Sequence, residues 1–362
     1  MTTVENRTET EPNAAAMEAF GDRMAGMLNE ACAALLTSIG HQTGLFDALA
    51  ATGLVTSTEL AEHAGLNERY VREWLGGMTV ARMVRYDAES DRYFLPPEHA
   101  AWLTTAAGPN NLAQTLQFVP MLAEVEQDIV ACFRNGGGLT YDHYPRFHAL
   151  MDADSRATVD ATLLDVVLPL VDGLDAKLTA GIDVADVGCG SGHAINVLAA
   201  AYPASRFTGL DFSPVAIERA RAEATSLGLD NAQFEVCDVA TLDRTATYDL
   251  VTAFDAIHDQ AHPGQVLAGV SRALRPDGTF LMVDIKASSN VEDNVGHPLA
   301  PALYTFSVLH CMTVSLGLDG DGLGTVWGRQ LASQMLAAAG FGQVDVHEVE
   351  HDPFNYYYVC RA

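Results

Sequence analysis

The stretch Asp186-Val187-Gly188-Cys189-Gly190-Ser191-Gly192 decides the fold of this chain. It ends an apolar segment, Asp183 to Val187, that has the composition of a buried strand, and a helical pattern follows it. Three glycines at alternate positions let the backbone turn tightly and let a ligand approach it closely. A strand, a glycine-rich turn and a helix in this order indicate a ligand-binding loop in an α/β fold.

Further apolar strands recur downstream of this loop, with helical patterns between them. The expected strands are Asp183 to Val187, Arg206 to Leu210, Gln233 to Val236, Asp249 to Phe254 and Thr279 to Ile285, and the clearest helices are Val215 to Leu227 and Gln265 to Leu274. This alternation predicts a doubly wound, Rossmann-like parallel sheet with helices on both faces. A terminal antiparallel hairpin, Val344 to Val349 and Asn355 to Cys360, brings the sheet to seven strands.

Acidic residues follow the first three strands, where ligands bind in such a sheet. Asp186 precedes the glycines, and a carboxylate there repels a pyrophosphate but suits a ligand with an ammonium group. Asp211 lies 19 residues past Gly192, where it can accept hydrogen bonds from ribose hydroxyls. Cys237 and Asp238 end the third strand, where a carboxylate can accept from an adenine amino group. Any one of these aspartates could simply cap a helix, but the full set is hard to explain by chance.

Residues Ala185 to Ile285 resemble the core of class I S-adenosylmethionine-dependent methyltransferases. The glycine loop is similar to their motif I, Asp211 to their motif II acid and Asp238 to their adenine-site acid. The resemblance implies S-adenosyl-L-methionine as the cofactor. The candidate cofactor-binding residues are Asp186, Gly188, Cys189, Gly190, Asp211, Phe212, Cys237, Asp238, Val239, Phe254 and, from upstream, Tyr141.

The N-terminal region has the pattern of a winged helix. Thr56 and Glu59 form a capping box before a short helix that ends at Gly65, and a second helix is expected from Glu68 to Met83. Two short extended stretches follow, Val84 to Tyr86 and Tyr93 to Leu95, and they complete a helix-turn-helix with a hairpin.

The whole chain is similar to a group of bacterial methyltransferases with an N-terminal winged helix, often described as transcriptional-regulator-like. The segments that carry this resemblance are Phe254 to Gln260, Asp284 to Ser289, Tyr304 to Leu316 and Asn355 to Tyr358. Plant-type and antibiotic O-methyltransferases resemble the same layout, which implies a homodimer formed through the winged helix.

These patterns predict four regions. A mobile tail is expected over residues 1–23, a winged-helix dimerisation domain over 24–103, a helical connector over 104–175, and a methyltransferase domain over 176–362. An insertion at about 290–330 in the last domain is expected to roof the substrate.

Two histidines are candidate catalytic residues. Methyl transfer from a sulfonium is an in-line displacement that needs alignment above all, and it needs a base only if the acceptor carries a proton. His258 lies just past the fourth strand, where the acceptor should meet the methyl group, and is the candidate base. His310 lies in the apolar segment Tyr304 to Leu316 and is a candidate substrate contact. The alternative is that both only hold a loop or pack a helix.

Other residues have weaker assignments. Lys286 and Asp284, at the end of the fifth strand, could pair with each other. Trp327 could pack over the pocket, and Tyr141 and Phe147 could close the donor site.

Composition restricts the partners and the location. There are 47 acidic and 20 basic residues, a net charge of −27, and such a field repels nucleic acid. No apolar run has the roughly 18 residues of a membrane span, and the N-terminus lacks the pattern of a signal peptide. Six scattered cysteines without a CxxC pair argue against zinc and disulfides. We therefore expect a cytoplasmic protein with no metal.

Three alternatives to a small-molecule methyltransferase remain. A donor-sensing DNA-binding regulator would use Arg69, Arg72 and Arg82, although acidic residues surround them. An NAD-dependent oxidoreductase conflicts with Asp186 and with the spacing of the glycines. An arsenite methyltransferase would need several converging thiolates.

Overall fold

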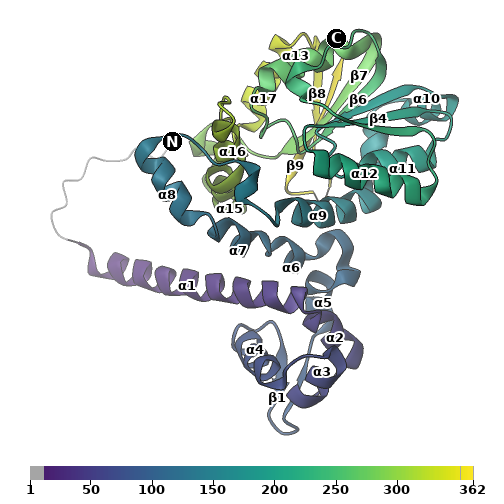
Figure 1. Cartoon of the computed structure of the whole chain (residues 1–362). Coiled ribbons are helices and arrows are strands. Elements are labelled where there is room, and N and C mark those ends of the chain that lie inside the picture. Colours follow the sequence, from purple (N-terminus) through teal and green to yellow (C-terminus); the bar gives the residue numbers. More distant parts are fainter. Residues whose placement is uncertain (1–11, 351, 362) are drawn as a thin grey trace. The chain divides into compact units, whose positions relative to one another are not determined.

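The computed structural model describes residues 12–350 and 352–361, which fold into two compact units, Met1–Pro120 and Met121–Ala362 (Figure 1). The predicted connector, 104–175, is not a unit of its own, because the division at Pro120 assigns its first part to the N-terminal unit. Among the described residues, no helix combines the length and the apolar character that crossing a bilayer requires.

The N-terminal unit contains a winged helix, as predicted, and a long helix precedes it. Its elements are α1 (Ala14–Gln42), α2 (Leu45–Thr52), α3 (Ser57–Ala64), α4 (Glu68–Val80), β1 (Arg85–Asp87), β2 (Arg92–Phe94), α5 (Pro97–Leu103), a 3₁₀ helix (Thr105–Asn110), α6 (Leu112–Thr115) and α7 (Phe118–Ala123), whose last residues belong to the second unit. The capping box of Thr56 and Glu59 is present at the start of α3. Phe46, Leu60 and Trp74 fill the core between these helices.

The predicted mobile tail, 1–23, is partly wrong. Helix α1 begins at Ala14, because the Asn13 side chain accepts a hydrogen bond from the Ala16 backbone and caps the helix. Residues 14–23 therefore belong to this helix. Residues 1–11 lie outside the described part of the chain.

The C-terminal unit alternates helices and strands. Its elements are α8 (Glu126–Asn135), a 3₁₀ turn (Tyr141–His143), α9 (Phe147–Thr162), a π-helical turn (Leu163–Val167), a 3₁₀ turn (Leu168–Leu170), α10 (Leu174–Ala180), β3 (Asp183–Val187), α11 (His193–Ala201), β4 (Arg206–Asp211), α12 (Pro214–Leu227), β5 (Ala232–Val236), a 3₁₀ turn (Val239–Thr241), β6 (Tyr248–Phe254), α13 (Pro263–Ala273), β7 (Leu274–Ile285), α14 (Val291–Asn294), α15 (Ala300–Phe306), a π-helical turn (Ser307–Cys311), α16 (Met312–Gly317), α17 (Gly328–Ala338), β8 (Gln343–His347) and β9 (Asn355–Arg361).

The seven strands form one sheet in the order β5-β4-β3-β6-β7-β9-β8. The first five are parallel, and β9 pairs antiparallel with both β7 and β8. The order reverses between β3 and β6, so the carboxyl ends of these two strands form the switch point where ligands bind in such sheets. The predicted doubly wound, seven-stranded sheet is confirmed.

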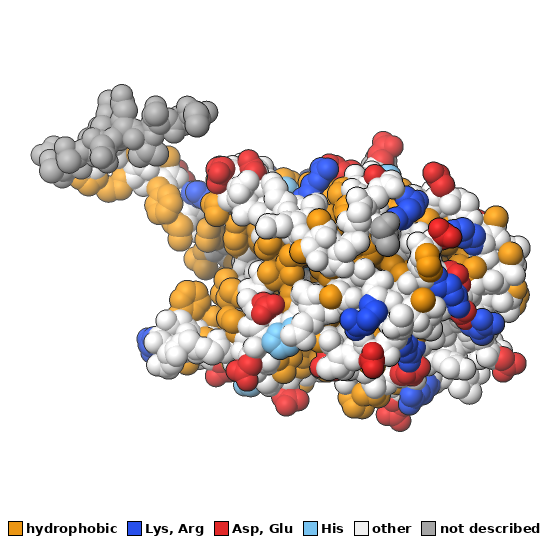
Figure 2. Space-filling view, turned by 90° about the horizontal axis from the view of Figure 1, so that it is seen from above, with side chains coloured by type: hydrophobic (Ala, Val, Ile, Leu, Met, Phe, Trp, Pro, Cys, Tyr) orange, Lys and Arg blue, Asp and Glu red, His pale blue; other side chains and the backbone are white. Residues whose placement is uncertain are grey.

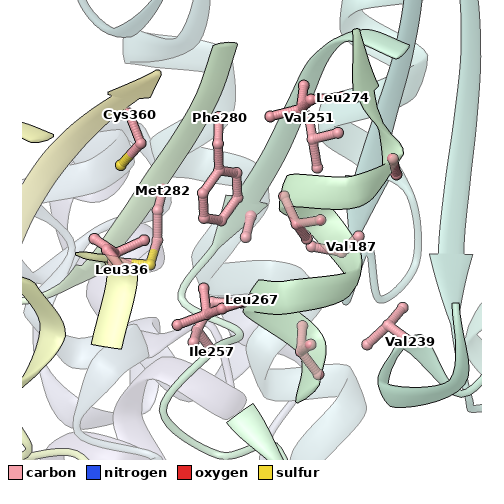
Figure 3. Packing of buried hydrophobic residues seen from close by; sticks show 14 of the residues in the cluster. Val187, Val239, Val251, Ile257, Leu267, Leu274, Phe280, Met282, Leu336 and Cys360 are labelled. Atoms are coloured by element: carbon pink, nitrogen blue, oxygen red, sulfur yellow. The ribbon is translucent and has the colours of Figure 1, made fainter. Parts of the chain in front are cut away.

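Alternate residues of each strand face opposite layers of helices (Figure 1). On one face, Val187, Val251 and Phe280 pack with α13 and α17 in a cluster that Figure 3 shows. On the other, Val184 and Leu250 pack with α10, α11 and α12. Burial on both faces explains why the strands are continuous apolar runs.

Candidate active site

The glycine loop leaves β3 and turns back before α11. Gly188, Gly190 and Gly192 all have positive φ, near +72°, +53° and +73°, a region that other residues rarely adopt. The backbone amides of Gly188 and Cys189 both donate to the Leu210 carbonyl at the end of β4. A Cβ at Gly188 would lie 2.6 Å from the Cβ of Ala256, so the loop also needs glycine there for close approach.

Asp186 and Asp211 lie at the ends of the two strands that flank this loop. Asp186 is only 2 % exposed, and its Oδ1 accepts a hydrogen bond from the Thr252 hydroxyl at 2.7 Å. Burial raises the pKa of Asp186 to about 7, against the opposing effect of Thr252. Asp211 accepts from the backbone amides of Gly190 and Ser213, at 2.9 and 2.8 Å, and burial raises its pKa too. Ionising either group is costly unless a cation or a hydrogen-bond donor faces it.

Both carboxylates line a cavity of about 270 Å³ at the switch point. The loops after β3, β4 and β6 form one side of it, and helix α9 forms the other. The predicted cofactor-binding residues that line it are Tyr141, Asp186, Gly188, Cys189, Gly190, Asp211, Phe212 and Phe254. Phe147, predicted with Tyr141 to close the donor site, lines it as well.

The structure does not bring the other three predicted cofactor residues, Cys237, Asp238 and Val239, into this cavity. Asp238 is exposed, and its Oδ1 accepts from the Ala240 backbone amide, so it caps the short helix that follows. Val239 packs in the core, and Cys237 is half-buried against it. The reason is that β5 is the edge strand, two strands away from the switch point.

The sequence did not single out two acidic residues of the loop after β6. Asp255 and Asp259 both line the cavity. The hydroxyl of Tyr141 donates to Asp259 Oδ2 at 2.9 Å, and burial raises the pKa of Asp259. Asp255 adopts a positive φ of 53°, and burial raises its pKa to about 7. Their position just after a central strand was a signal that could have found them.

Aromatic rings form another wall of the cavity. Tyr141 stacks on His148, with ring centres 5.6 Å apart, and also contacts Phe147 and Phe212. All four rings line the cavity. Helix α9 supplies Phe147 and His148, together with polar residues further along.

Comparisons with known proteins separate the two parts of the chain. Residues 31–105 match the Rv2258c-like winged HTH domain, and residues 178–305 match a methyltransferase domain, which contains the glycine loop, Asp186, Asp211, Asp255 and Asp259. The chain carries a class I methyltransferase domain. The predicted combination of winged helix and methyltransferase fold is confirmed.

Curated relatives match a part of the chain. Trans-aconitate 2-methyltransferase of Methylobacterium nodulans is 35 % identical over 141 residues, which are 39 % of this chain and 48 % of that protein. The malonyl-[acyl-carrier protein] O-methyltransferase of Acetivibrio thermocellus is 29 % identical over 127 residues, 35 % of this chain and 43 % of that protein. The chain therefore spans about half the length of the curated relatives it matches.

Solved structures match nearly the whole chain. The mitomycin 7-O-methyltransferase MmcR superposes with a TM-score of 0.67 at 19 % identity, over 97 % of this chain and 100 % of that one. Human N-acetylserotonin methyltransferase, solved with S-adenosylmethionine, has a TM-score of 0.65 at 16 % identity, over 98 % and 100 %. At these identities the likeness extends to the fold.

Neither predicted catalytic histidine lines the cavity of the methyltransferase domain. His258 is 3 % exposed, and its Nδ1 lies 3.0 Å from Asp284 Oδ1 and 3.7 Å from Asp255 Oδ1. It thus lies one layer behind the cavity wall. His310 is 1 % exposed and stacks on Phe147 with ring centres 3.8 Å apart, and burial lowers its pKa to about 3.

Two weaker predictions for this domain are wrong. Lys286 pairs with Glu348 and not with Asp284, whose Oδ1 is occupied by His258, Trp327 and the Ile285 amide. Trp327 is 3 % exposed and packs in the core, so it does not cover the pocket. Among the described residues of the insertion 290–330, none lines this cavity, and its role as a roof over the substrate stays a prediction.

Proposed function

We propose that this protein transfers a methyl group from S-adenosylmethionine to a small-molecule acceptor by in-line displacement. The observation that carries the proposal is the convergence of Asp186, Asp211 and the glycine loop on one cavity inside a methyltransferase domain. The proposal also rests on the relatives, which are named as methyltransferases of small molecules or of an acyl-carrier protein.

The charge of the cavity supports a cationic donor. Asp186, Asp211, Asp255 and Asp259 contribute carboxylates, while Arg219 is the only arginine or lysine among the described residues that line it. The donor carries a sulfonium and an ammonium group against one carboxylate. We assign Asp186 to the ammonium side and Asp211 to the ribose hydroxyls, with Phe212 beside the adenine. The pyrophosphate of NAD is negatively charged, so the same carboxylates would repel it.

We further propose that Asp259 receives the proton of the acceptor when the acceptor carries one. Asp259 lines the cavity, and its Oδ2 is oriented by the Tyr141 hydroxyl. A base must lie within hydrogen-bond reach of the acceptor, and a raised pKa favours proton uptake. His258 lies behind the wall and is assigned to holding Asp284 and the loop after β6. His310 does not line the cavity, so we propose that it acts on the substrate indirectly, by supporting Phe147, on which it stacks.

A homodimer formed through the N-terminal unit is part of the proposal. Helix α1 exposes a row of large apolar side chains, which Figure 2 shows in orange on the helix that leads from the larger grey segment. These are Met17, Phe20, Met24, Met27, Leu28, Leu35 and Ile39. Isolated exposed apolar residues are common, but a contiguous row of this kind is typical of a protein interface. The cytoplasmic location stays a prediction.

The DNA-binding alternative receives little support from the winged helix. Arg69 pairs with Glu73 and Arg72 with Glu68 along α4, so two of its three candidate cations are already neutralised on the same helix. Phosphate binding depends on such cations being available.

A transfer assay tests the proposed function. The purified full-length chain is incubated with tritiated S-adenosylmethionine and a small-molecule extract of the source cells, with a heat-inactivated sample as control. The proposal predicts a labelled compound that forms only with the native chain. A chain that binds the donor but labels no compound in any extract would contradict the proposed transfer.

A further inference from the structure

Helix α9 covers the donor cavity but is weakly packed. Nine of its residues line the cavity: Phe147, His148, Met151, Asp152, Asp154, Ser155, Thr158, Val159 and Thr162. Leu150 is the only buried residue of the helix. Apolar contact, the usual source of helix stability in a protein, is therefore limited to a few side chains, such as Val159 against the core and Phe147 on His310. Polar contacts also hold α9 against the domain.

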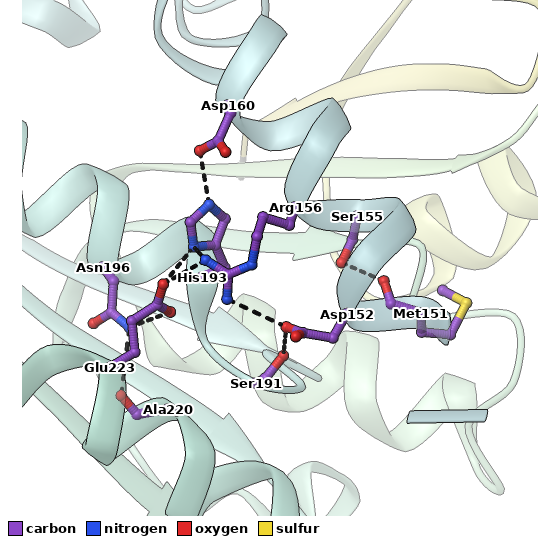
Figure 4. Close-up of polar contacts among 10 residues, drawn as sticks. All are labelled: Met151, Asp152, Ser155, Arg156, Asp160, Ser191, His193, Asn196, Ala220 and Glu223. Atoms are coloured by element: carbon purple, nitrogen blue, oxygen red, sulfur yellow. Dashed lines mark hydrogen bonds and ion pairs between the residues drawn. The ribbon is translucent and has the colours of Figure 1, made fainter. Parts of the chain in front are cut away.

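A polar cluster on one face of α9 supplies these contacts (Figure 4). Asp152, Arg156 and Asp160 are spaced four residues apart and so lie on the same side of the helix. Arg156 Nη1 lies 2.6 Å from Glu223 Oε1 of α12 and 2.7 Å from His193 Nδ1 of α11. His193 Nε2 lies 2.8 Å from Asp160 Oδ1. We call Asp152, Arg156, Asp160, His193 and Glu223 the latch.

The latch also contacts the donor loop itself. The hydroxyl of Ser191, within the glycine loop, donates to Asp152, and Arg156 Nη2 lies 3.5 Å from the same carboxylate. Burial raises the pKa of Glu223, but hydrogen bonds from Arg156, Asn196 and His193 outweigh it and lower the pKa to about 2. Glu223 is thus ionised at neutral pH and stays available to Arg156.

His193 links the parts of the latch. Asp160 Oδ1 can only accept, so Nε2 of His193 donates to it at 2.8 Å. Nδ1 lies 2.9 Å from Glu223 Oε1 and 2.7 Å from Arg156 Nη1, and Arg156 also donates to Glu223. Arg156 thus joins α9 to α11 through His193 and to α12 through Glu223.

The two ends of α9 are fixed while its middle depends on the latch. Before the helix, the Tyr144 hydroxyl donates to the Leu309 carbonyl. After it, the π-helical turn Leu163–Val167 buries both of its end residues, and such turns are often points of functional adjustment. The cavity measures about 270 Å³, just below the roughly 300–1,000 Å³ of ligand pockets in general.

We propose that α9 is a lid over the donor cavity, and that the latch centred on Arg156 holds it closed. This inference rests on the proposed function for the identity of the ligand. Donor enters when the latch opens, and closure then brings Asp152 onto Ser191 of the glycine loop. Arg156 is a positioning residue, because it does not line the cavity.

Binding kinetics test the lid with S-adenosylhomocysteine as the probe, measured by surface plasmon resonance on the full chain. In R156M we expect koff to rise about five- to tenfold, because the variant loses the hydrogen bonds and ion pairs of a partly exposed arginine. We also expect kon to rise, because the open state is more populated. R156K should restore part of both rates, since it keeps the charge but loses the fork of donors.

The control is R275M, which removes a doubly paired arginine of similar exposure, 37 % against 38 % for Arg156, that pairs with Asp183 and Asp249 at the opposite ends of β3 and β6. It should leave both rates unchanged. Hydrogen exchange of the free protein should be faster over residues 147–162 in R156M and unchanged over 183–187. If R156M raises koff but leaves kon and hydrogen exchange as in the native chain, Arg156 only supports the closed structure. That result would contradict the proposed lid. Failure of the native chain to bind the probe would contradict the proposed function instead.

Discussion

Replacing Gly190 with alanine separates donor binding from folding. A Cβ at Gly190 would meet no atom within 4 Å, and Gly190 lines the cavity where we place the donor. The positive φ of 53° costs about 1 kcal/mol for alanine. That loss should lower the Tm by about 2–4 °C in a unit of this size. Affinity for S-adenosylhomocysteine should fall at least tenfold, because the methyl group occupies space that the donor needs.

Gly192 provides the matched comparison within the same loop. Its φ of 73° carries the same backbone strain, but a Cβ there would lie 2.4 Å from Phe234 and 2.6 Å from Ala220, in the core and not in the cavity. G192A should therefore lose about 2–4 kcal/mol of stability, the strain plus the overpacking. Calorimetric titration and thermal unfolding of both variants are the assays. Native affinity in a folded G190A chain would refute the placement of the donor on this loop.

Asp186, Trp327 and the winged helix lead to four further predictions. Burial raises the pKa of Asp186 to about 7, so this carboxylate takes up a proton as the pH falls from 8 to 6, and affinity for S-adenosylhomocysteine should fall with it. Binding should then release a proton from Asp186, which titrations in buffers of different ionisation enthalpy measure. The D186N variant should lack this proton release. The same raised pKa favours the protonated folded state, so the stability of the free chain should decrease as the pH rises from about 4 to about 7, and urea unfolding should show a smaller decrease in D186N. W327F removes the hydrogen bond to Asp284 from the core, so denaturant unfolding should show a loss of about 1–3 kcal/mol, with donor affinity kept. A mobility shift with genomic DNA at low salt should show no tight complex, and salt-sensitive binding there would revive the regulator alternative.

The sheet was predictable because its strands are buried on both faces. The continuous apolar run Phe280 to Val283 leaves little ambiguity about the strand that contains it, and the structure ends β7 at the predicted residue, Ile285. The loop after β3 was equally clear, since its three glycines all adopt the positive φ that their spacing suggested. The capping box of Thr56 and Glu59 likewise placed the start of α3.

The cavity was less predictable because side-chain direction does not follow from position along a strand. Asp211 and Asp238 both follow strands, but only Asp211 belongs to a strand next to the switch point, while β5 lies at the edge of the sheet. His258 follows a central strand, yet its side chain turns back to Asp284. Asp255 and Asp259, beside it, face the cavity.

The sequence of helix α9 gives no sign that the helix covers the donor cavity. It buries one residue, and its contacts depend on charged partners more than thirty residues away, such as His193 and Glu223. Spacing along one helix shows which residues share a face but not which loop they meet. The sequence therefore did not show that α9 covers the donor cavity.

Calorimetric titration of the full chain with S-adenosylhomocysteine and, separately, with NADH tests the central claim most directly. The claim is that Asp186, Asp211 and the glycine loop form a site for a cationic nucleoside donor. It predicts one molecule of S-adenosylhomocysteine bound per chain and no heat of binding from NADH. Binding of NADH without binding of S-adenosylhomocysteine would contradict it.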